Sequence, residues 1–242
     1  MKYVGSKNRI AKYIVPLIQS RINKLGNKCN GYFEPFVGGG NIIDKIKCLH
    51  KYGADNNKYL IALLCYVRDH SDTLPLTVDK ETYNYVHKHL NDNSFDDWFI
   101  GLVGFCASYN SKFFGGYANN VHTKIGTIRN YTDEAIRNLI KQAPNLQGID
   151  FQYRDFQDIS TNISNFVIYC DPPYRNTTKY MTGNFPYEKY YDWCRALSQN
   201  NIVLCSEYWM PDDFECIWTK DIKCTLDKNS RSNKTEKLFI LN

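Results

Sequence analysis

The chain has 242 residues, of which 43% are hydrophobic and 23% charged, and its net charge is +5. This balance is typical of one large α/β domain or of a core domain with an insertion, and the mild basic charge is compatible with a polyanionic partner. The longest apolar run, residues 59–67, is far shorter than the ~20 residues that span a bilayer, and the N-terminal residues lack an apolar signal core. Nine cysteines without a Cys-x-x-Cys pair argue against a disulfide framework and a zinc site, so we expect a cytoplasmic protein with no membrane partner.

The first predicted helix follows a short motif, Tyr3-Val4-Gly5-Ser6-Lys7. Apolar residues recur at helical spacing over residues 9–22, and Ser6 is a residue type that caps such helices. Pro16 falls inside this pattern and is expected to kink or restart the helix. Taken alone, Lys7 indicates only a solvated lysine at the start of a helix.

A glycine-rich loop follows the first predicted strand, which contains Tyr32 and Phe33. The loop is Phe36-Val37-Gly38-Gly39-Gly40, and a helix is expected over residues 41–50. A strand, a glycine turn and a helix in this order cradle nucleotides, because glycines let the backbone approach a ligand. No Gly-Lys-Ser/Thr follows, as a phosphate loop would need, and Ile43 stands where a dinucleotide loop has its third glycine. A nucleoside without phosphates, such as S-adenosylmethionine, therefore fits better, with a plain tight turn as the alternative.

The pattern Gly53-Ala54-Asp55 indicates the end of a second strand with an acid at its tip. Asp55 comes 17 residues after Gly38, close to the ~20-residue spacing at which an acid meets a ribose hydroxyl in nucleotide-binding units. The alternative role is to cap the helix expected over residues 57–68. Asp55 and Asn56 could divide these two tasks.

Residues 70–131 lose the alternation of strands and helices. Within them, residues 108–130 carry Lys112, Lys124 and Arg129 but no Asp or Glu. Aromatic residues are interleaved with glycine and asparagine turn signals, a composition that suits phosphate contact and base stacking. A packed aromatic subdomain with solvated lysines explains the pattern equally well.

A helix is expected over residues 132–142, with Thr132 as its cap, followed by a strand over residues 151–156. The strand ends with Asp155 and Phe156. An acid and an aromatic ring at this place could hold an adenine, by a hydrogen bond to its amino group and a contact with its face. An ordinary turn is the alternative.

The strongest single feature is an apolar run, Phe166–Cys170, that ends at Asp171-Pro172-Pro173-Tyr174. A short run rich in β-branched and aromatic residues predicts a buried strand, and two consecutive prolines cannot continue a β-ladder. A carboxylate, a rigid turn and an aromatic ring are therefore expected at the carboxyl end of a core strand. In open α/β sheets this edge is where ligands bind.

The remaining residues complete the α/β pattern. Residues 175–187 show no periodicity and are expected to form a mobile loop over the site. A helix over residues 187–199 and a strand over residues 202–205 make a further α/β unit, and residues 217–226 and 236–241 indicate a terminal hairpin. The connection between its strands carries basic residues that either contact phosphates or are solvated: Lys228, Arg231, Lys234 and Lys237.

Together these motifs resemble the DNA adenine methyltransferase (Dam) family. Residues 3–7 match its aromatic-x-Gly-Gly-Lys motif, with Ser6 in place of the second glycine, and residues 32–40 match its Glu-Pro-Phe-x-Gly-x-Gly loop. Asp55-Asn56 matches its acidic motif, and residues 169–174 match its catalytic strand and turn. Residues 230–242 resemble its terminal strand region. In residues 71–130 the resemblance is loose, and Tyr109-Asn110 is its clearest point.

The resemblance implies an α/β fold, a Rossmann-like class I methyltransferase core with a mostly parallel seven-stranded sheet. The core would comprise residues 1–69 and 131–242, and residues 70–130 would form an inserted target-recognition domain. S-adenosylmethionine would be the cofactor, and by resemblance its pocket is lined by Tyr3, Lys7, Phe36, Gly38, Gly40, Asp55, Asp155, Phe156 and Asp171. Double-stranded DNA would be the partner, and the expected DNA-contacting residues are Tyr109, Asn110, Lys112, Lys124 and Arg129.

The expected reaction is methyl transfer to the exocyclic amino group of adenine, whose lone pair is delocalised into the ring. Asp171 and the Pro172 carbonyl would accept the amino hydrogens, and Tyr174 would stack on the base. The base must be flipped out of the duplex, at a cost of a few kcal/mol, before the methyl group transfers in line over ~3–3.5 Å.

Other functions are alternatives to this one. A ring methyltransferase for cytosine would need a Pro-Cys pair, which is absent from the sequence. Residues 87–89 (His-Lys-His) indicate a surface segment rather than a metal site. A methyltransferase for another amino group, in RNA, cytosine or a protein glutamine, and a binding module without turnover remain alternatives. We expect a monomer in a bacterial or phage-infected cell; a restriction–modification role would involve a partner endonuclease that the sequence does not indicate.

Overall fold

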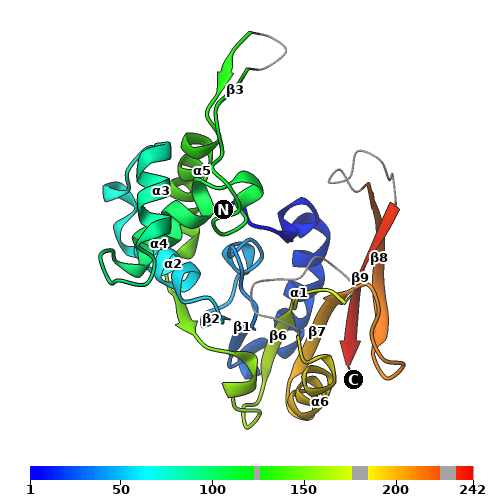
Figure 1. Ribbon diagram of the computed structural model, residues 1–242. Coiled ribbons are helices and arrows are strands. Elements are labelled where there is room, and N and C mark those ends of the chain that lie inside the picture. The colour runs from blue at the N-terminus through cyan, green and yellow to red at the C-terminus, as the bar shows by residue number, and fades with distance from the viewer. Residues whose placement is uncertain (123–125, 176–184, 224–232, 242) are drawn as a thin grey trace. The chain divides into compact units, whose positions relative to one another are not determined.

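The computed structural model describes residues 1–122, 126–175, 185–223 and 233–241 (Figure 1). The chain divides into two compact units. The first unit comprises residues 1–12, 37–45 and 53–154, and the second comprises residues 13–36, 46–52 and 155–242. None of the helices in the described ranges combines the length and apolar character that a membrane-spanning segment needs.

Seven strands hydrogen-bond in the order β5-β2-β1-β6-β7-β9-β8. Their bounds are β1 Gly31–Glu34, β2 Lys51–Asp55, β5 Ile149–Tyr153, β6 Phe166–Cys170, β7 Ile202–Glu207, β8 Glu215–Lys223 and β9 Asn233–Leu241. Strands β1, β6 and β7 run parallel, and β9 is antiparallel to both β7 and β8. The predicted α/β fold with a mostly parallel seven-stranded sheet is confirmed.

The strand order reverses between β1 and β6, which are neighbours in the second unit with Phe33 opposite Ile168. Their carboxyl ends therefore meet at one edge of the sheet, and in open α/β sheets such a switch point is where ligands bind. Strand β6 has the predicted bounds, and its last four residues are buried. The place that the sequence assigns to Asp171 is thus the topological switch point.

The α-helices described in the second unit are α1 (Ala11–Leu25) and α6 (Tyr187–Ser198). Helix α1 continues through Pro16 as one helix, so the predicted restart at Pro16 is wrong. Its Tyr13 ring stacks on Trp218 of β8, with ring centroids 6.0 Å apart. Helix α6 buries one face, including Cys194 and Leu197, and contacts β7.

The first unit is mostly helical. It contains α2 (Lys58–His70), α3 (Lys80–Lys88), α4 (Asp97–Gly101), which runs into a π-helical turn (Leu102–Cys106), and α5 (Tyr131–Leu146). Helices α2 and α4 pack closely because position 101 is glycine: a Cβ there would lie 2.2 Å from the carbonyl oxygen of Tyr59. A two-stranded ribbon, β3 (Val121–His122) and β4 (Ile128–Arg129), extends away from α5 (Figure 1).

Two local predictions are wrong in their detail. Residues 41–50 do not form an α-helix, and only a short 3-10 turn, Ile43–Lys45, is present. The carbonyls of Gly39 and Gly40 accept hydrogen bonds from the Gln142 side chain, so tertiary contacts replace the hydrogen bonds that a helix would supply. The cap of α5 is Asn130 rather than Thr132, because the Asn130 side chain accepts from the amides of residues 132 and 133.

The division into a core and an inserted domain at residues 70–130 stays a prediction. The first compact unit contains these residues, but it also contains the glycine loop, α2, α5 and β5.

Candidate active site

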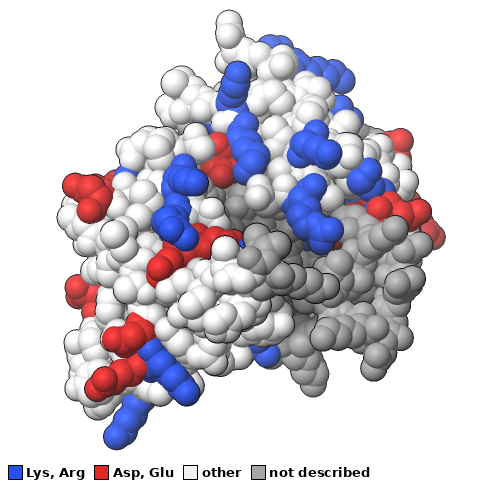
Figure 2. Space-filling view, turned by 90° about the horizontal axis from the view of Figure 1, so that it is seen from above, with Lys and Arg blue, Asp and Glu red and all other residues white. Residues whose placement is uncertain are grey.

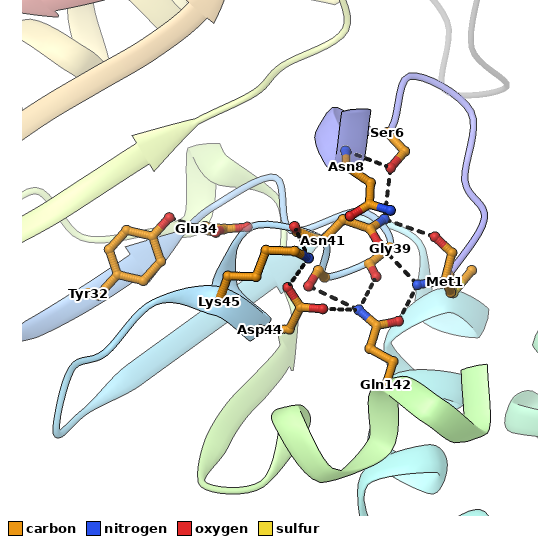
Figure 3. A network of polar contacts seen from close by, with 11 residues as sticks. Met1, Ser6, Asn8, Tyr32, Glu34, Gly39, Asn41, Asp44, Lys45 and Gln142 are labelled. Atoms are coloured by element: carbon orange, nitrogen blue, oxygen red, sulfur yellow. Dashed lines mark hydrogen bonds and ion pairs between the residues drawn. The ribbon is translucent and has the colours of Figure 1, made fainter. Parts of the chain in front are cut away.

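The carboxyl end of β1 carries a buried polar pair in the second unit. Glu34 is only 2% exposed, and its Oε1 accepts a hydrogen bond of 2.6 Å from the hydroxyl of Tyr32 (Figure 3). Burial raises the pKa of Tyr32 far above its usual range, and the charge of Glu34 raises it further. Tyr32 therefore stays a hydrogen-bond donor that fixes the Glu34 carboxylate at the switch point.

The Asp171–Tyr174 turn leaves β6 at the same edge. Asp171 is partly exposed, Pro172 is buried, and the carbonyl of Pro173 accepts a hydrogen bond of 2.9 Å from the Tyr187 hydroxyl of α6. Burial raises the pKa of Tyr174, and the Asp171 charge raises it further. Tyr187, which fixes this turn from α6, carries no sequence signal that singles it out.

The Tyr174 ring is buried, although the predicted stacking on a substrate base would need an exposed ring face. Its side chain is 8% exposed, its hydroxyl donates to Glu236 Oε2 at 2.9 Å, and its ring meets Tyr208 edge-on at 4.6 Å between centroids. The ring is therefore held by neighbours from β9 and from the end of β7. Its predicted contact with a substrate base stays a prediction.

The residue after this turn is held by a buried acid. Glu207, the last residue of β7, is 1% exposed and accepts from the backbone N–H of Arg175 at 3.0 Å and of Tyr208 at 2.7 Å. Arg175 lies over the rings of Tyr187 and Trp209, at 5.5 and 5.6 Å. Sequence reasoning missed Glu207, because neither the glycine-loop spacing that marks Asp55 nor the double proline that marks Asp171 accompanies it.

Two predicted cofactor residues from distant segments meet in the second unit. The rings of Phe36 and Phe156 lie 5.6 Å apart, and Phe185 contacts both. Phe156 opens a short 3-10 helix whose cap is Asp155, which accepts from the Gln157 amide at 2.9 Å. Phe156 is only 3% exposed, because Phe36 and Phe185 pack against its ring, so its predicted contact with adenine stays a prediction.

Three predicted cofactor residues, Tyr3, Gly38 and Asp55, lie together at the glycine loop in the first unit. Asp55 Oδ2 accepts from the Gly38 amide at 3.1 Å, and its Oδ1 accepts from the Asn57 amide at 3.0 Å. Gly38 has φ +50°, and a Cβ there would lie 3.1 Å from the Tyr3 ring, so only glycine fits without strain. Lys7 is 8% exposed and donates to the Gly5 carbonyl at 3.2 Å, so it is not the solvated lysine of the alternative reading.

Burial raises the pKa of Asp55 to about 6, although hydrogen bonds from the Gly38, Asn57 and Asn56 amides act to lower it. Its side chain therefore changes from a carboxylate to a neutral acid as the pH falls through about 6. Asn57, rather than Asn56, caps α2 by accepting from the Leu60 amide.

The described residues expected to contact DNA lie on the surface of the first unit. Tyr109 is 64% exposed, Asn110 has φ +54°, and Lys112 is exposed. Arg129 of β4 makes two hydrogen bonds to Glu134, at 2.6 and 2.8 Å, and lies 4.8 Å over the Tyr131 ring. Lys124 lies outside the described residues, as do most of the predicted mobile loop and the basic residues 228 and 231.

Figure 2 shows several Lys and Arg side chains on the face in view, with Asp and Glu side chains also present there. The Lys and Arg side chains suit a polyanionic partner, since they contact phosphates without reading sequence.

Among the described residues, one group could hold a metal ion. The sulfur atoms of Cys170, Cys194 and Cys205 lie within 4.8 Å of one another in the core of the second unit. Thiolates select soft cations, but buried cysteines also pack as small apolar side chains. Cys170 faces the core, as its place in β6 indicates, and scattered cysteines in the sequence gave no sign of this grouping.

The sequence matches the model of a protein family along most of its length. The model of the D12 class N6 adenine-specific DNA methyltransferases matches residues 3–201. The chain therefore belongs to the D12 class N6 adenine-specific DNA methyltransferase family, as the resemblance of its motifs predicted.

Two curated relatives are a methyltransferase and a methylase by name. The type II methyltransferase M.FokI of Planomicrobium okeanokoites is 23% identical over 81% of this chain and 31% of its own length. The modification methylase StsI of Streptococcus sanguinis is 26% identical over 74% of this chain and 29% of its own length. The chain thus spans about a third of the length of each curated relative.

A solved structure of a conserved hypothetical protein from Streptococcus pyogenes is 8% identical to this chain. Its TM-score is 0.34 over 92% of this chain and 94% of that one, a likeness too weak to support a conclusion.

Proposed function

We propose that the chain is a DNA adenine methyltransferase, which transfers a methyl group from S-adenosylmethionine to the exocyclic amino group of an adenine flipped out of double-stranded DNA. The observation that carries this proposal is the position of Asp171-Pro172-Pro173-Tyr174 at the switch point of the sheet, beside the end of β1. Membership of the D12 family supports it.

The residues present fit the cofactor. Gly38 packs directly against the Tyr3 ring, and the Asp55 carboxylate beside it is an acceptor suited to a ribose hydroxyl. In the second unit, Phe36 packs against Phe156, and the Asp155 carboxylate next to Phe156 is an acceptor suited to the adenine amino group. When bound, S-adenosylmethionine supplies a methyl group activated by its positively charged sulfur.

Asp171 and Pro172 would activate the substrate. The Asp171 carboxylate and the Pro172 carbonyl accept the two hydrogens of the adenine amino group, which draws the nitrogen toward a tetrahedral shape and returns electron density to its lone pair. Two hydrogen bonds hold this turn in place. The Tyr187 hydroxyl donates to the Pro173 carbonyl, and the Glu207 carboxylate accepts from the Arg175 amide. Preorganised acceptors of this kind lower the barrier because they need no rearrangement during the reaction.

DNA would bind through the exposed basic and aromatic residues of the first unit, Tyr109, Asn110, Lys112 and Arg129, with Lys124 as a further candidate. The net charge of +5 is compatible with a nucleic-acid substrate. The support for DNA over an RNA base or a protein glutamine is the family, whose description names adenine in DNA; the two curated relatives are a type II methyltransferase and a modification methylase by name.

The test is methyl transfer from labelled S-adenosylmethionine to unmethylated genomic DNA, followed by digestion to nucleosides and sequencing of the modified positions. We expect N6-methyladenine in a short recurring sequence. Label on cytosine, RNA or protein would redirect the assignment to another amino group. Cofactor binding without transfer to any of them would indicate a module without turnover.

A further inference from the structure

The glycine loop of the first unit is held by a side chain from a distant helix. Gln142 lies in α5, is 6% exposed, and directs its amide nitrogen at the loop (Figure 3). Its Nε2 donates to the carbonyl oxygens of Gly39 and Gly40, both at 3.1 Å, and to Asp44 Oδ2 at 2.9 Å. Three acceptors thus converge on one amide group that has two hydrogens.

A second amide extends this network to the N-terminal motif. Asn41, which follows the last loop glycine, donates from Nδ2 to Ser6 Oγ and to the Met1 carbonyl, both at 2.9 Å. The Met1 nitrogen in turn donates to Asn41 Oδ1 at 3.0 Å and to Gln142 Oε1. The motif around Ser6 and the glycine loop are therefore fastened to each other and to α5 (Figure 3).

The loop needs such external fixation. Gly38 and Gly40 both have positive φ, at +50° and +66°, and glycines have the largest conformational freedom to lose. Asp55 fixes the loop from one side by accepting from the Gly38 amide, and Gln142 fixes its carbonyls from the other. No helix follows the loop to hold it, since residues 43–45 make only a 3-10 turn.

We propose that Gln142 is a positioning residue that fixes residues 38–40 in the shape that binds S-adenosylmethionine, and so sets the affinity for this cofactor. The inference rests on the proposed function, because it assigns the loop to the cofactor. Gln142 acts through the loop backbone and not on the reacting atoms, so its loss weakens cofactor binding while the chemical step is largely kept.

The decisive variant is Gln142→Glu. It preserves size and helix propensity but replaces the donor nitrogen with a carboxylate oxygen that faces three oxygen acceptors. We expect the Kd for S-adenosylmethionine to rise by at least about tenfold, since the lost hydrogen bonds and the new repulsion exceed 1.4 kcal/mol together. At saturating cofactor, we expect kcat to stay within about threefold of the wild type.

The matched control is Asn138→Asp, the same change of amide to carboxylate on an exposed residue one turn earlier in α5. It should leave the Kd unchanged. Gln142→Met, a neutral substitution of similar length, is the second variant in case Gln142→Glu does not fold, and it should also weaken binding. Calorimetric titration of the purified full chain with S-adenosylmethionine gives Kd, and thermal unfolding without cofactor gives stability.

The outcomes separate the two proposals. If the wild type binds no S-adenosylmethionine, the proposed function itself fails and the inference with it. If the wild type binds it and the folded Gln142 variants bind equally well, the inference alone is overturned. A lower melting temperature with an unchanged Kd would also overturn it, because Gln142 would then have a purely structural role.

Discussion

The carboxylate of Glu207, buried at the end of β7, accepts a hydrogen bond of 3.0 Å from the backbone N–H of Arg175, the residue that follows Tyr174. Its other oxygen accepts from the Tyr208 amide. One side chain thus ties the exit of the proposed catalytic turn to the neighbouring strand. Because β6 and β7 pair in parallel, with Cys170 opposite Cys205, the tie fixes the turn relative to the core of the sheet.

Removing this tie should slow methyl transfer. We expect Glu207→Ala to lower kcat by about 10- to 100-fold, because small displacements of groups that align reactants carry penalties of this size. The free energy of unfolding should fall by about 1.5–3 kcal/mol, since two backbone donors lose a charged acceptor. Glu207→Gln keeps one acceptor oxygen and should recover part of kcat. The exposed Glu81→Gln is the control, and an unchanged kcat in Glu207→Ala would refute the positioning role.

Asp171→Asn should abolish detectable methyl transfer, or reduce it by at least about 100-fold, because the neutral amide loses the negative charge that would draw on the adenine amino hydrogen, and its remaining oxygen is a weaker acceptor. Binding of DNA and of S-adenosylmethionine should change much less. The measurement is single-turnover transfer of labelled methyl groups, together with a DNA-binding titration. Transfer at the wild-type rate would remove Asp171 from the proposed mechanism.

Tyr174→Phe should be mild and Tyr174→Ala severe. The phenylalanine keeps the buried ring and loses only the hydroxyl that donates to Glu236 at 2.9 Å, so we expect a stability loss of about 1 kcal/mol. Alanine removes a buried ring against Tyr208 and should cost about 3–5 kcal/mol. Urea unfolding of both variants checks the stability, and transfer kinetics check the proposed base contact. Equal activity in the two variants would exclude a role for the ring.

Asp55 should make cofactor affinity depend on pH. Because burial raises its pKa to about 6, the side chain loses its charge below that pH and becomes a weaker acceptor for a ribose hydroxyl. The affinity for S-adenosylmethionine should therefore fall as the pH drops through about 6. Stability has the opposite sign: a raised pKa means that the folded state favours the protonated acid, so the Asp55 contribution is fully present below about pH 4 and is lost as the pH rises through about 6.

The variant Asp55→Asn isolates this effect. It should remove the step near pH 6 from both profiles, measured by calorimetric titration and by urea unfolding between about pH 5 and pH 8. The exposed Asp158→Asn is the control and should keep both steps. A wild-type profile without a step near pH 6 would contradict the assignment to Asp55.

Arg129 should contact DNA only when its hydrogen bonds to Glu134 break. Its guanidinium makes two short hydrogen bonds to that carboxylate, which also pairs with Lys2 at 2.6 Å. We expect Glu134→Gln to strengthen DNA binding, and Arg129→Ala to weaken it and to reduce the slope of log K against log salt by about 1. Arg21→Ala, on α1, is the control. An unchanged salt slope in Arg129→Ala would place this residue outside the DNA contact.

Local sequence determined the elements whose causes are local. Two consecutive prolines end β6 at Cys170, so the position of Asp171 at the end of a core strand followed from a few neighbouring residues. Periodicity predicted α2, α6 and the terminal hairpin, and the bounds differ from the observed ones by a few residues. The motifs also assigned Gly38 and Asp55 to one cofactor pocket. In the structure Asp55 Oδ2 accepts a hydrogen bond of 3.1 Å from the Gly38 amide.

Only the tertiary structure decided how these elements are fastened. Gln142 reaches Gly39 across 103 residues of sequence, and Glu207 reaches Arg175 across 32. A single buried amide or carboxylate leaves no periodic pattern, because its partner is selected by how distant segments pack. For the same reason residues 41–50 look helical in sequence but are not, since their neighbouring carbonyls are satisfied by Gln142 from α5.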